Sequence, residues 1–423
     1  MIKGITMSLV KSAFKTEIFE IDFTPDKYVI AYSGGVDSQV LLHLAANSLD
    51  APVIAVHCHH GVSENSDLWA QHCKAQASKL NVTCFVEHLN LGNTASNFEA
   101  VAREKRYEAL KSHMSDKSVL LTGHHMDDQA ETMLMRLLRG SGIDGLSCIA
   151  SRSKQDGLTI CRPLLGVRKA DLKRYADANE LEWVEDESND SCDFDRNFIR
   201  NEVLPLVKTR WPDAVSSIAQ SVEHCSNARD ELHELTDNDL DYVRSSIKAD
   251  ALELDKLKQL SKFRRTSLYR KWLEKLYGKL PGKSELEFID KVFVETEDAV
   301  TQYKSHEYVI YLYRGMLCFS HQGKTKQFYL EEFSLRQHKA DKPKLVNVPS
   351  ASECNWRERK EGDKMRFRGK TKSLKKVFQE AGIPSWERSQ YKVLELNGDI
   401  VAIGDIISSD YLDFEGFRIK VKE

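Results

Sequence analysis

The sequence predicts an α/β protein in which a doubly wound parallel sheet is followed by a small helical domain and an α+β C-terminal domain. Three observations support this prediction. Strand-like and helix-like segments alternate from residue 27 to about residue 125, which is typical of a parallel sheet with helices on both faces. A charged, leucine-bearing helical pattern dominates residues 215–320, and strand-like alternation returns near the C-terminus. With 423 residues, the chain is also too long for one ordinary core.

Short apolar runs indicate the strands of the first domain, and the helical spacing of apolar residues indicates its helices. We expect strands at residues 28–31, 53–57, 83–87 and 119–122. We expect helices at residues 40–48, 67–80, 98–111, 127–139, 168–179 and 197–208. The last of these ends before Trp211-Pro212, because proline cannot continue a helix. Ligands on such sheets bind beyond the carboxyl ends of the strands.

Composition shifts divide the chain into four parts. We predict a first domain at residues 1–215, a helical domain at 216–320, a polar linker at 321–344 and a C-terminal domain at 345–423. The C-terminal domain begins with a basic stretch, and it ends with strand-like alternation at 393–396, 400–403 and 417–421.

The composition is that of a soluble globular protein, with 41% hydrophobic and 30% charged residues. No apolar run approaches the roughly 20 residues that span a bilayer, and lysines interrupt the apolar residues at the N-terminus, so we expect no membrane partner and no signal peptide. Nine cysteines without a Cys-x-x-Cys pair favour free thiols in a reducing compartment, so we expect a cytoplasmic protein. The net charge of −3 means that nucleic-acid binding requires local basic clusters.

The strongest local signal is a glycine-containing turn between the first strand and the first helix. It consists of Ser33, Gly34, Gly35, Val36, Asp37 and Ser38. The glycines let backbone N–H groups approach a phosphate closely, and the helix start adds unpaired donors and partial positive charge. The serines add hydroxyl donors, and Asp37 can hold a magnesium ion that bridges phosphate oxygens. A tight turn without ligand is the alternative, but it would need neither both serines nor the aspartate.

The second signal, HHMDDQAET from His124 to Thr132, begins at a strand end and runs into a helix. Asp127 and Glu131 share one face of that helix, and Asp128 lies about 100° away. One carboxylate can therefore face the phosphate loop while its neighbour caps the helix, where the dipole favours negative charge. We expect the Asp127/Asp128 pair to take part in magnesium binding or acid–base chemistry.

Histidines end the second strand, at His57, His59 and His60. A zinc site is one reading, but alternate side chains of an extended segment point to opposite faces and no second ligand cluster follows. We favour a strand end that lines a nucleotide pocket.

Basic residues recur at the predicted sheet edge and in the last domain. The arginines of interest are Arg103, Arg106, Arg139, Arg162, Arg196 and Arg200. Together they would suit phosphate and base contacts, although each alone is most often ion-paired or solvated. The acidic run around Asp186 could recognise an amine or could be a solvated loop. Residues 356–388 hold eleven Lys or Arg and five Asp or Glu, interleaved with aromatics. That mixture fits RNA, or a charged face over core aromatics.

SGGVDS, HHG and HHMDDQAET in this order resemble the PP-loop ATP pyrophosphatase superfamily, whose fold is adenine nucleotide alpha hydrolase-like. Longer runs resemble the tRNA(Ile)-lysidine synthase family within it. These are HHGVSENSDLW, EAVAREKRY, LRGSGIDGL, CRPLL, WVEDESN and DRNFIRNEVLPL, and in the C-terminal domain WRERKEGDKMRF and KSLKKVFQEAGIP.

The resemblance implies ATP-dependent ligation of L-lysine to C2 of the wobble cytidine of an isoleucine tRNA with a CAU anticodon. The intermediate would be an adenylated tRNA, pyrophosphate and AMP would leave, and the cofactors would be ATP and Mg²⁺. A tRNA thiolase of the same superfamily is the alternative. Homodimerisation is left open.

The motifs and the resemblance together imply specific roles. Catalysis would use Asp37, Asp127, Asp128, Arg103 and Arg196, with Mg²⁺ on Asp37 and Asp127. ATP would contact residues 33–38, His57 and His125. The lysine or tRNA would contact Arg106, Glu131, Arg139, Arg162, Asp186, Asn197, Arg200, Arg357, Arg359 and Lys375. We also expect an Asp127/Asp128 carboxylate to assist deprotonation of the lysine ε-ammonium.

Overall fold

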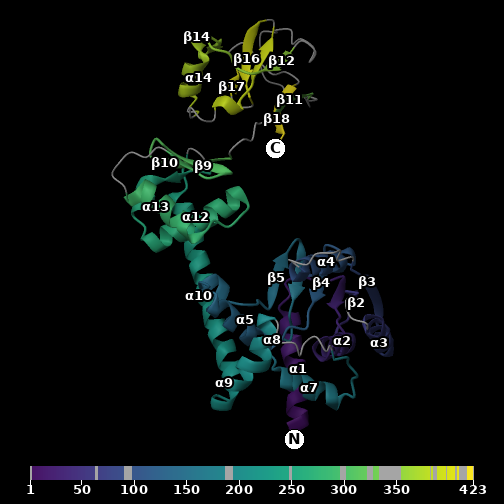
Figure 1. Ribbon diagram of the computed structural model, residues 1–423. Coiled ribbons are helices and arrows are strands. Elements are labelled where there is room, and N and C mark those ends of the chain that lie inside the picture. Colours follow the sequence, from purple (N-terminus) through teal and green to yellow (C-terminus); the bar gives the residue numbers. More distant parts are fainter. Residues whose placement is uncertain are drawn as a thin grey trace. The chain divides into compact units, whose positions relative to one another are not determined.

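The protein is described from a computed structural model (Figure 1). The structure describes residues 2–61, 65–89, 98–185, 194–246, 250–295, 302–321, 327–332, 354–381, 383, 388–396, 398–404, 407–408 and 417–422. The chain forms two compact units, Met1–Leu232 and His233–Glu423, whose boundary lies inside helix α10 (Ala214–Val243). This boundary lies C-terminal to the one expected near residue 215, because α10 begins in the first unit and ends in the second.

A six-stranded sheet organises the first unit. Its strands are β1 (Lys27–Ala31), β2 (Val53–His59), β3 (Thr83–His88), β4 (Ser118–Leu121), β5 (Arg152–Gln155) and β6 (Leu158–Cys161). Their order is β3-β2-β1-β4-β6-β5. All neighbours pair in parallel except β5 and β6, which are antiparallel. The predicted parallel sheet is confirmed, and the four strands expected from sequence shift by two residues at most.

The two faces of the sheet hold separate cores, because successive side chains of a strand point to opposite sides. Tyr28 and Ile30 of β1 belong to a cluster with α1 (Ile2–Phe19), α2 (Val36–Ser48) and α7 (Lys169–Ala178). Val29, between them, belongs to a cluster that includes Leu110 of α4 (Phe98–Ser112). Helices therefore cover both faces, as the doubly wound prediction requires.

The other helices of this unit are α3 (Ser66–Lys79), α5 (Met126–Leu138), α6 (Ile143–Leu146), α8 (Asp195–Phe198), α9 (Leu204–Arg210) and α10. Helices α3 and α5 shift by one residue from the expected ranges, and α6 was not predicted. A π-helical turn, η2 (Ile199–Val203), joins α8 to α9 in place of the single α-helix expected there. Ala130 of α5 packs with Ile199, Leu204 and Val215, so α5 is held against this segment and α10.

The strand order fixes where a site can form. After β1 the chain moves through β2 and β3 on one side, and then returns to β4 on the other side of β1. Open α/β sheets bind ligands at the carboxyl ends of strands where the order reverses. The SGGVDS segment follows β1 and the HHMDD segment follows β4, so the two strongest sequence signals meet at this point.

The first part of the second unit is not purely helical. Helices α11 (Leu254–Lys258), α12 (Lys262–Tyr277) and α13 (Lys283–Asp290), with the π-helical turn η3 (Lys291–Glu295), share a core with four strands. These are β7 (Leu252–Glu253), β8 (Gln302–Lys304), β9 (Tyr308–Tyr313) and β10 (Met316–His321), in the order β7-β10-β9-β8. The sequence analysis did not predict these strands, since charged and leucine-rich helices dominate the composition around them.

The last part of the chain is α+β, as predicted. Strands β12 (Cys354–Arg357), β13 (Lys364–Phe367), β14 (Lys370–Ser373), β15 (Val393–Leu396), β16 (Asp399–Ile403) and β17 (Ile407–Ser408) form one sheet beside α14 (Leu374–Glu380) and the short helix η5 (Arg388–Gln390). Within the expected linker, β11 (Gln327–Glu332) pairs with the final strand β18 (Phe417–Lys422). Within the described residues, no helix is long and apolar enough to cross a bilayer.

Candidate active site at the carboxyl edge of the sheet

The SGGVDS turn forms a compact loop with internally arranged hydroxyl groups. Ser33 Oγ lies 3.0 Å from Ser38 Oγ, and the N–H of Gly34 donates to Ser38 Oγ at 3.1 Å. Gly35 is the residue before α2, and Val36 begins that helix. The loop therefore places two hydroxyl groups beside the N-terminus of a helix, where unpaired N–H groups favour an anion.

Gly34 is required by the local geometry. Its φ is +88°, which L-residues rarely adopt, and an added Cβ would lie 2.8 Å from Cys73 Sγ. The carbonyl of Gly34 accepts a hydrogen bond from the N–H of Val184 at 3.0 Å. A segment that follows α7 therefore contacts the loop between β1 and α2 and helps to hold it in place.

Gly123, which the sequence analysis did not single out, allows the two motifs to touch. A Cβ at Gly123 would lie 3.1 Å from the backbone carbon of Asp37 and 3.2 Å from the N of Ser38. A side chain there would press on the backbone of α2, so glycine suits the close approach of the segment after β4. Its position directly before HHMDD is the signal that could have identified it.

His125 connects the phosphate loop to the carboxylate motif. It is 2% exposed, with Nε2 3.5 Å from Asp37 Oδ2 and Nδ1 3.5 Å from Asp128 Oδ2. Burial disfavours its charged form, but the contact with Asp37 and the negative charge of Asp128 outweigh burial and raise the pKa of His125. The other Asp37 oxygen, Oδ1, is buried and has no partner.

Two arginines cross from the α8–η2 segment to buried carboxylates on α5. Arg196 donates from Nη2 to Asp128 at 2.6 Å and from Nε to Glu131 at 2.8 Å. Arg200 donates from Nε and Nη2 to Glu131 at 2.6 and 2.9 Å. Glu131 is 1% exposed, and the positive charges of Arg196 and Arg200 compensate for the cost of burying its carboxylate. The structure thus brings together four residues predicted for the site.

Asp128 also caps α5, since its Oδ2 accepts the N–H of His125 at 2.8 Å. Burial raises the pKa of Asp128, but the positive charges of His125 and Arg196 and the backbone hydrogen bond lower it below its usual value. A carboxylate with such donors stays ionised and is a weak proton acceptor.

Asp127 points to different partners. Its Oδ2 accepts the N–H of Lys169 at 2.8 Å, and Lys208 Nζ lies 3.4 Å from its Oδ1. Each Asp127 oxygen thus has one donor in the structure, and the expected magnesium pair of Asp37 and Asp127 stays a prediction. Among the described residues, no cluster of three or more His, Cys, Asp or Glu side chains could hold a metal ion.

Arg162 and His124 lie at the same edge, after β6 and β4 respectively. Arg162 is 7% exposed and donates from Nη1 to the carbonyl of Ala150 at 2.8 Å and to Ser153 Oγ at 3.1 Å. His124 Nδ1 forms a 2.8 Å hydrogen bond with Thr122 Oγ1, and burial lowers the pKa of His124 to about 4. Arg162 thus lies on the connection that follows β6, and its side chain is buried there by contacts within the protein.

Of the other residues predicted for the site in this unit, Arg103, Arg106 and Arg139 are exposed, whereas His57 is buried. Arg103 lies over the Tyr107 ring at 5.2 Å, Arg106 contacts His60 at 3.3 Å and Arg139 pairs with Asp195 at 2.9 Å. Asn197 is half-buried on α8, and Asp186 lies outside the described residues.

His57 is buried beneath the loop, with Nδ1 3.0 Å from the carbonyl of Tyr32 and 3.4 Å from Cys73 Sγ. Burial lowers its pKa. The His57 side chain therefore supports the end of β2 from inside the core and does not project from the sheet edge.

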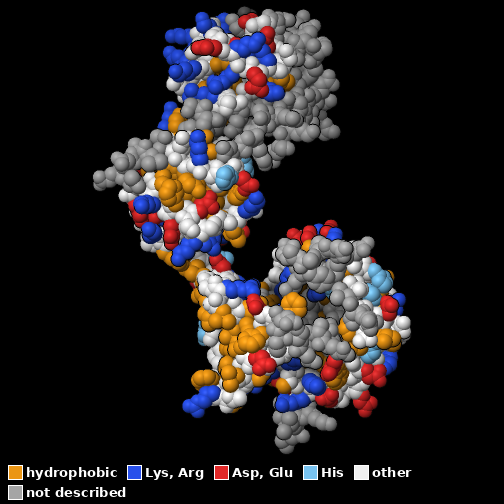
Figure 2. All heavy atoms as spheres, viewed as in Figure 1, with side chains coloured by type: hydrophobic (Ala, Val, Ile, Leu, Met, Phe, Trp, Pro, Cys, Tyr) orange, Lys and Arg blue, Asp and Glu red, His pale blue; other side chains and the backbone are white. Residues whose placement is uncertain are grey.

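The basic residues of the last domain fall into two groups. Arg357 pairs with Asp363 at 2.9 Å and also with Glu395, so it braces strands β12 and β15. Arg359 and Lys375 are exposed. So are Lys364, Arg366, Arg368, Lys370 and Lys376, on the β13–β14 hairpin and the start of α14. Figure 2 shows Lys and Arg side chains gathered on this part of the chain.

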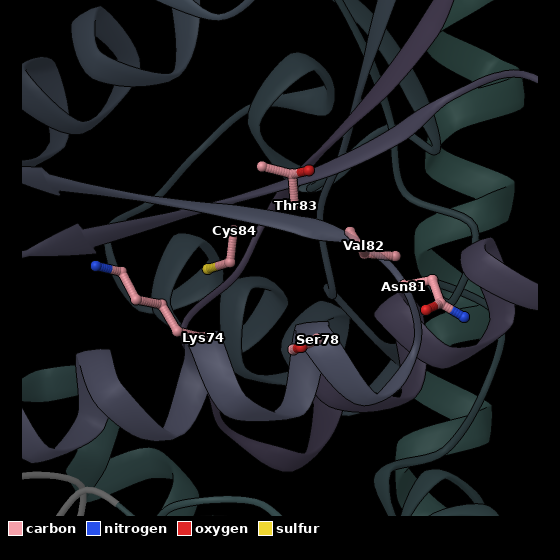
Figure 3. A pocket seen from close by; sticks show the side chains of 6 residues that line it. All are labelled: Lys74, Ser78, Asn81, Val82, Thr83 and Cys84. Carbon is pink, nitrogen blue, oxygen red and sulfur yellow. The ribbon is translucent and has the colours of Figure 1, made fainter.

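A depression of about 330 Å³ lies elsewhere, between α3 and the start of β3 (Figure 3). Lys74, Ser78, Asn81, Val82, Thr83 and Cys84 line it. Strand β3 begins at this place, whereas the phosphate loop follows the end of the parallel strand β1, so the two lie at opposite edges of the sheet. Burial raises the pKa of the Cys84 thiol to about 11, which leaves it unreactive near neutral pH.

Two family models match the chain. The "PP-loop domain" matches residues 8–207, and the "TilS substrate C-terminal domain" matches residues 354–419. The first contains the whole of the carboxyl-edge site, and the second contains the basic hairpin.

Curated relatives match over nearly the whole chain. The tRNA(Ile)-lysidine synthase of Vibrio parahaemolyticus is 35% identical over 404 residues, which are 90% of this chain and 91% of the relative. That of Coxiella burnetii is 33% identical over 436 residues, 95% of each chain. Among solved structures, the U34-tRNA thiolase NcsA from Methanococcus maripaludis covers 53% of this chain and 80% of its own, at 16% identity and a TM-score of 0.45.

Proposed function

The chain belongs to the tRNA(Ile)-lysidine synthase family, and from this premise we propose that it ligates L-lysine to C2 of the wobble cytidine of the CAU-anticodon isoleucine tRNA. The enzyme class is a ligase that forms a carbon–nitrogen bond at the expense of ATP. The observation that carries the proposal is the meeting of the SGGVDS loop and the HHMDD helix at one sheet edge, joined through His125.

In the first step the cytidine O2 attacks the α-phosphorus of ATP. A P–O bond to the base forms, the bond between the α- and β-phosphates breaks, and pyrophosphate leaves. The loop at the start of α2 would hold the phosphates through backbone N–H groups and the Ser33 and Ser38 hydroxyls. Arg196 and Arg200 are held beside the loop by Asp128 and Glu131, where positive charge would oppose the negative charge of the leaving group.

A magnesium ion would fit Asp37. The Oδ1 atom of Asp37 is a buried carboxylate oxygen without a partner, which is the ligand type that Mg²⁺ prefers. His125 holds the other oxygen, so the carboxylate is already oriented. The ion, when bound, would supply charge neutralisation for the phosphates.

In the second step the lysine ε-amine attacks C2, a C–N bond forms and AMP leaves. Free lysine has a pKa of about 10.4, so supplying the neutral amine near pH 7.4 costs about 4 kcal/mol. The lowered pKa of Asp128 argues against that carboxylate as the proton acceptor. We propose instead that Asp128 is a positioning residue, which aligns Arg196 and the backbone of His125.

The exposed basic residues of the β13–β14 hairpin and α14 would contact tRNA phosphates, whereas Arg357 would act only in stability. Free thiols among the described cysteines fit a reducing cytoplasm, which we propose as the compartment.

The test is release of pyrophosphate and AMP by the full chain with ATP, lysine and a transcript of the cognate tRNA. Omitting the RNA should abolish AMP release, and omitting lysine should leave pyrophosphate release with an adenylated RNA. Formation of ADP and phosphate would refute the proposal. A thiolase would instead transfer sulfur to the transcript, which mass spectrometry of the RNA would detect as a mass change inconsistent with added lysine.

A further inference from the structure

The segment that carries the two cluster arginines has a second, exposed face. Arg196 and Arg200 fix one side of it to the α5 carboxylates. Phe198 follows Arg196 by two residues, or about 200° around a helix, so it faces away from that cluster. Phe194 lies one turn before Phe198, whose N–H donates to the Phe194 carbonyl at 3.0 Å. Phe194 is 61% exposed and Phe198 is 49% exposed.

Phe194 and Phe198 are exposed together on one helical segment. Single exposed hydrophobic residues are common on protein surfaces, whereas a contiguous exposed apolar patch often marks an interaction site. Leu137 and Leu138, at the end of α5, are 55% and 79% exposed. The ion pair of Arg139 with Asp195 joins the end of α5 to the start of α8. The exposed surface is therefore an apolar patch crossed by an arginine, and Figure 2 shows hydrophobic side chains over α5 on the face in view.

We propose that Phe194 and Phe198 form a stacking platform for unpaired RNA bases that flank the reacting cytidine. This inference rests on the proposed function. A base that reacts at a buried edge must leave its stack, and its neighbours then lose stacking partners. Aromatic side chains replace that stacking without reading sequence.

Charge and position favour RNA over a second copy of the chain. The platform lies on the same short segment as Arg196 and Arg200, which hold Asp128 and Glu131, so only the width of these helical turns separates it from the reaction cluster. Both members of the Arg139–Asp195 pair are exposed, at 62% and 76%, so this pair contributes little stability and its guanidinium can exchange the carboxylate for a phosphate. A second copy would have to cover this arginine and the adjoining site.

The test uses the full chain and a labelled RNA hairpin that presents the CAU anticodon in its loop. The Phe198→Leu variant keeps an apolar side chain and removes the ring, whereas Phe198→Trp keeps a ring. Stacking predicts that the leucine variant weakens hairpin binding, measured by fluorescence anisotropy, by about tenfold or more. The tryptophan variant should bind like the unsubstituted protein. Phe194→Leu should act in the same direction.

Phe19→Leu is the matched control, because it removes an 88% exposed ring from α1, and it should leave binding unchanged. Equal binding by Phe198→Leu and Phe198→Trp would overturn the platform. A change from dimer to monomer on either Phe198 substitution, seen by light scattering without loss of RNA affinity, would assign the face to a second copy and also overturn it. Failure of the proposed function is distinguishable, since it would appear as absence of RNA-dependent AMP release in the unsubstituted protein.

Discussion

His125 Nε2 lies 3.5 Å from Asp37 Oδ2, so a histidine that follows β4 orients the carboxylate of a loop that follows β1. Gly123 favours this close approach, because a Cβ there would lie only 3.1 Å from the backbone carbon of Asp37. The loop and the carboxylate helix therefore behave as one unit. Three predictions follow from the geometry around them, and a fourth concerns the β13–β14 hairpin.

Replacing Gly34 by alanine should strongly lower ATP-dependent pyrophosphate release. The positive φ costs roughly 1–2 kcal/mol for an L-residue, and the added Cβ would lie 2.8 Å from Cys73 Sγ. The measurement is kcat/KM for ATP. A Gly34→Ala/Cys73→Ala double variant should recover part of the loss, because the φ penalty remains. Gly166→Ala is the control, since it has nothing within 4 Å and no positive φ. Unchanged kinetics for Gly34→Ala would contradict a tightly fitted loop.

Asp128→Asn should slow the lysine step by about tenfold or more, equally at pH 7 and pH 9. Burial raises the pKa of Asp128, but His125 and Arg196 outweigh burial and lower it, so it stays ionised throughout this range. The substitution weakens charge-assisted hydrogen bonds, each worth about 1.5–3 kcal/mol. Single-turnover kinetics on preformed adenylated RNA measure the step. A loss that largely disappears at pH 9 would restore the base role expected from the sequence.

Protonation of His124 should lower the free energy of unfolding of the first unit in mild acid. Its pKa is about 4 in the fold and about 6.5 when unfolded, so between these values the unfolded chain binds more protons. Stability from the neutral imidazole is complete above pH 6.5 and falls as the pH drops towards 4, by about 3 kcal/mol. Denaturant unfolding of the full chain and of His124→Gln, compared at pH 7 and 5, measures the difference. Parallel losses in both proteins would show that His124 does not cause it.

Neutralising Arg366, Arg368 and Lys370 should weaken tRNA binding and leave the KM for ATP unchanged. These side chains are exposed on the β13–β14 hairpin. Each lost phosphate contact should lower the salt dependence of binding by about one unit of slope. Lys15→Gln, an exposed charge on α1, is the control. Arg357→Gln should act differently and lower domain stability, because Arg357 binds Asp363 and Glu395. An unchanged salt slope in the triple variant would remove the hairpin from the RNA contact surface.

The sequence predicted the parallel sheet and the meeting of its two motifs, because strand alternation and carboxyl-end geometry are local rules. It could not predict which carboxylate faces the phosphate loop. Asp127 and Asp128 differ by only about 100° on α5, and the choice depends on Lys169 and Lys208 from distant segments. Arg162 lies on the segment after β6, but its burial against Ala150 and Ser153 depends on the antiparallel pairing of β5 with β6, which no motif indicates.

The strands of the middle region were also missed. β9 and β10 are short and follow long helices, so their alternation was outweighed by helical spacing. The polar composition around β11 indicated a linker, but β11 pairs with the distant strand β18. Such a pairing depends on tertiary context, which local composition does not reveal.

That pairing has a consequence for synthesis of the protein. Because β11 begins at Gln327 and its partner β18 begins only at Phe417, the two-stranded sheet cannot close until the residues of β18 have left the ribosome. A chain that lacks β18 would leave the edge of β11 open, and exposed edges of this kind invite aggregation. Translation through β18 is thus a condition for this part of the protein to mature.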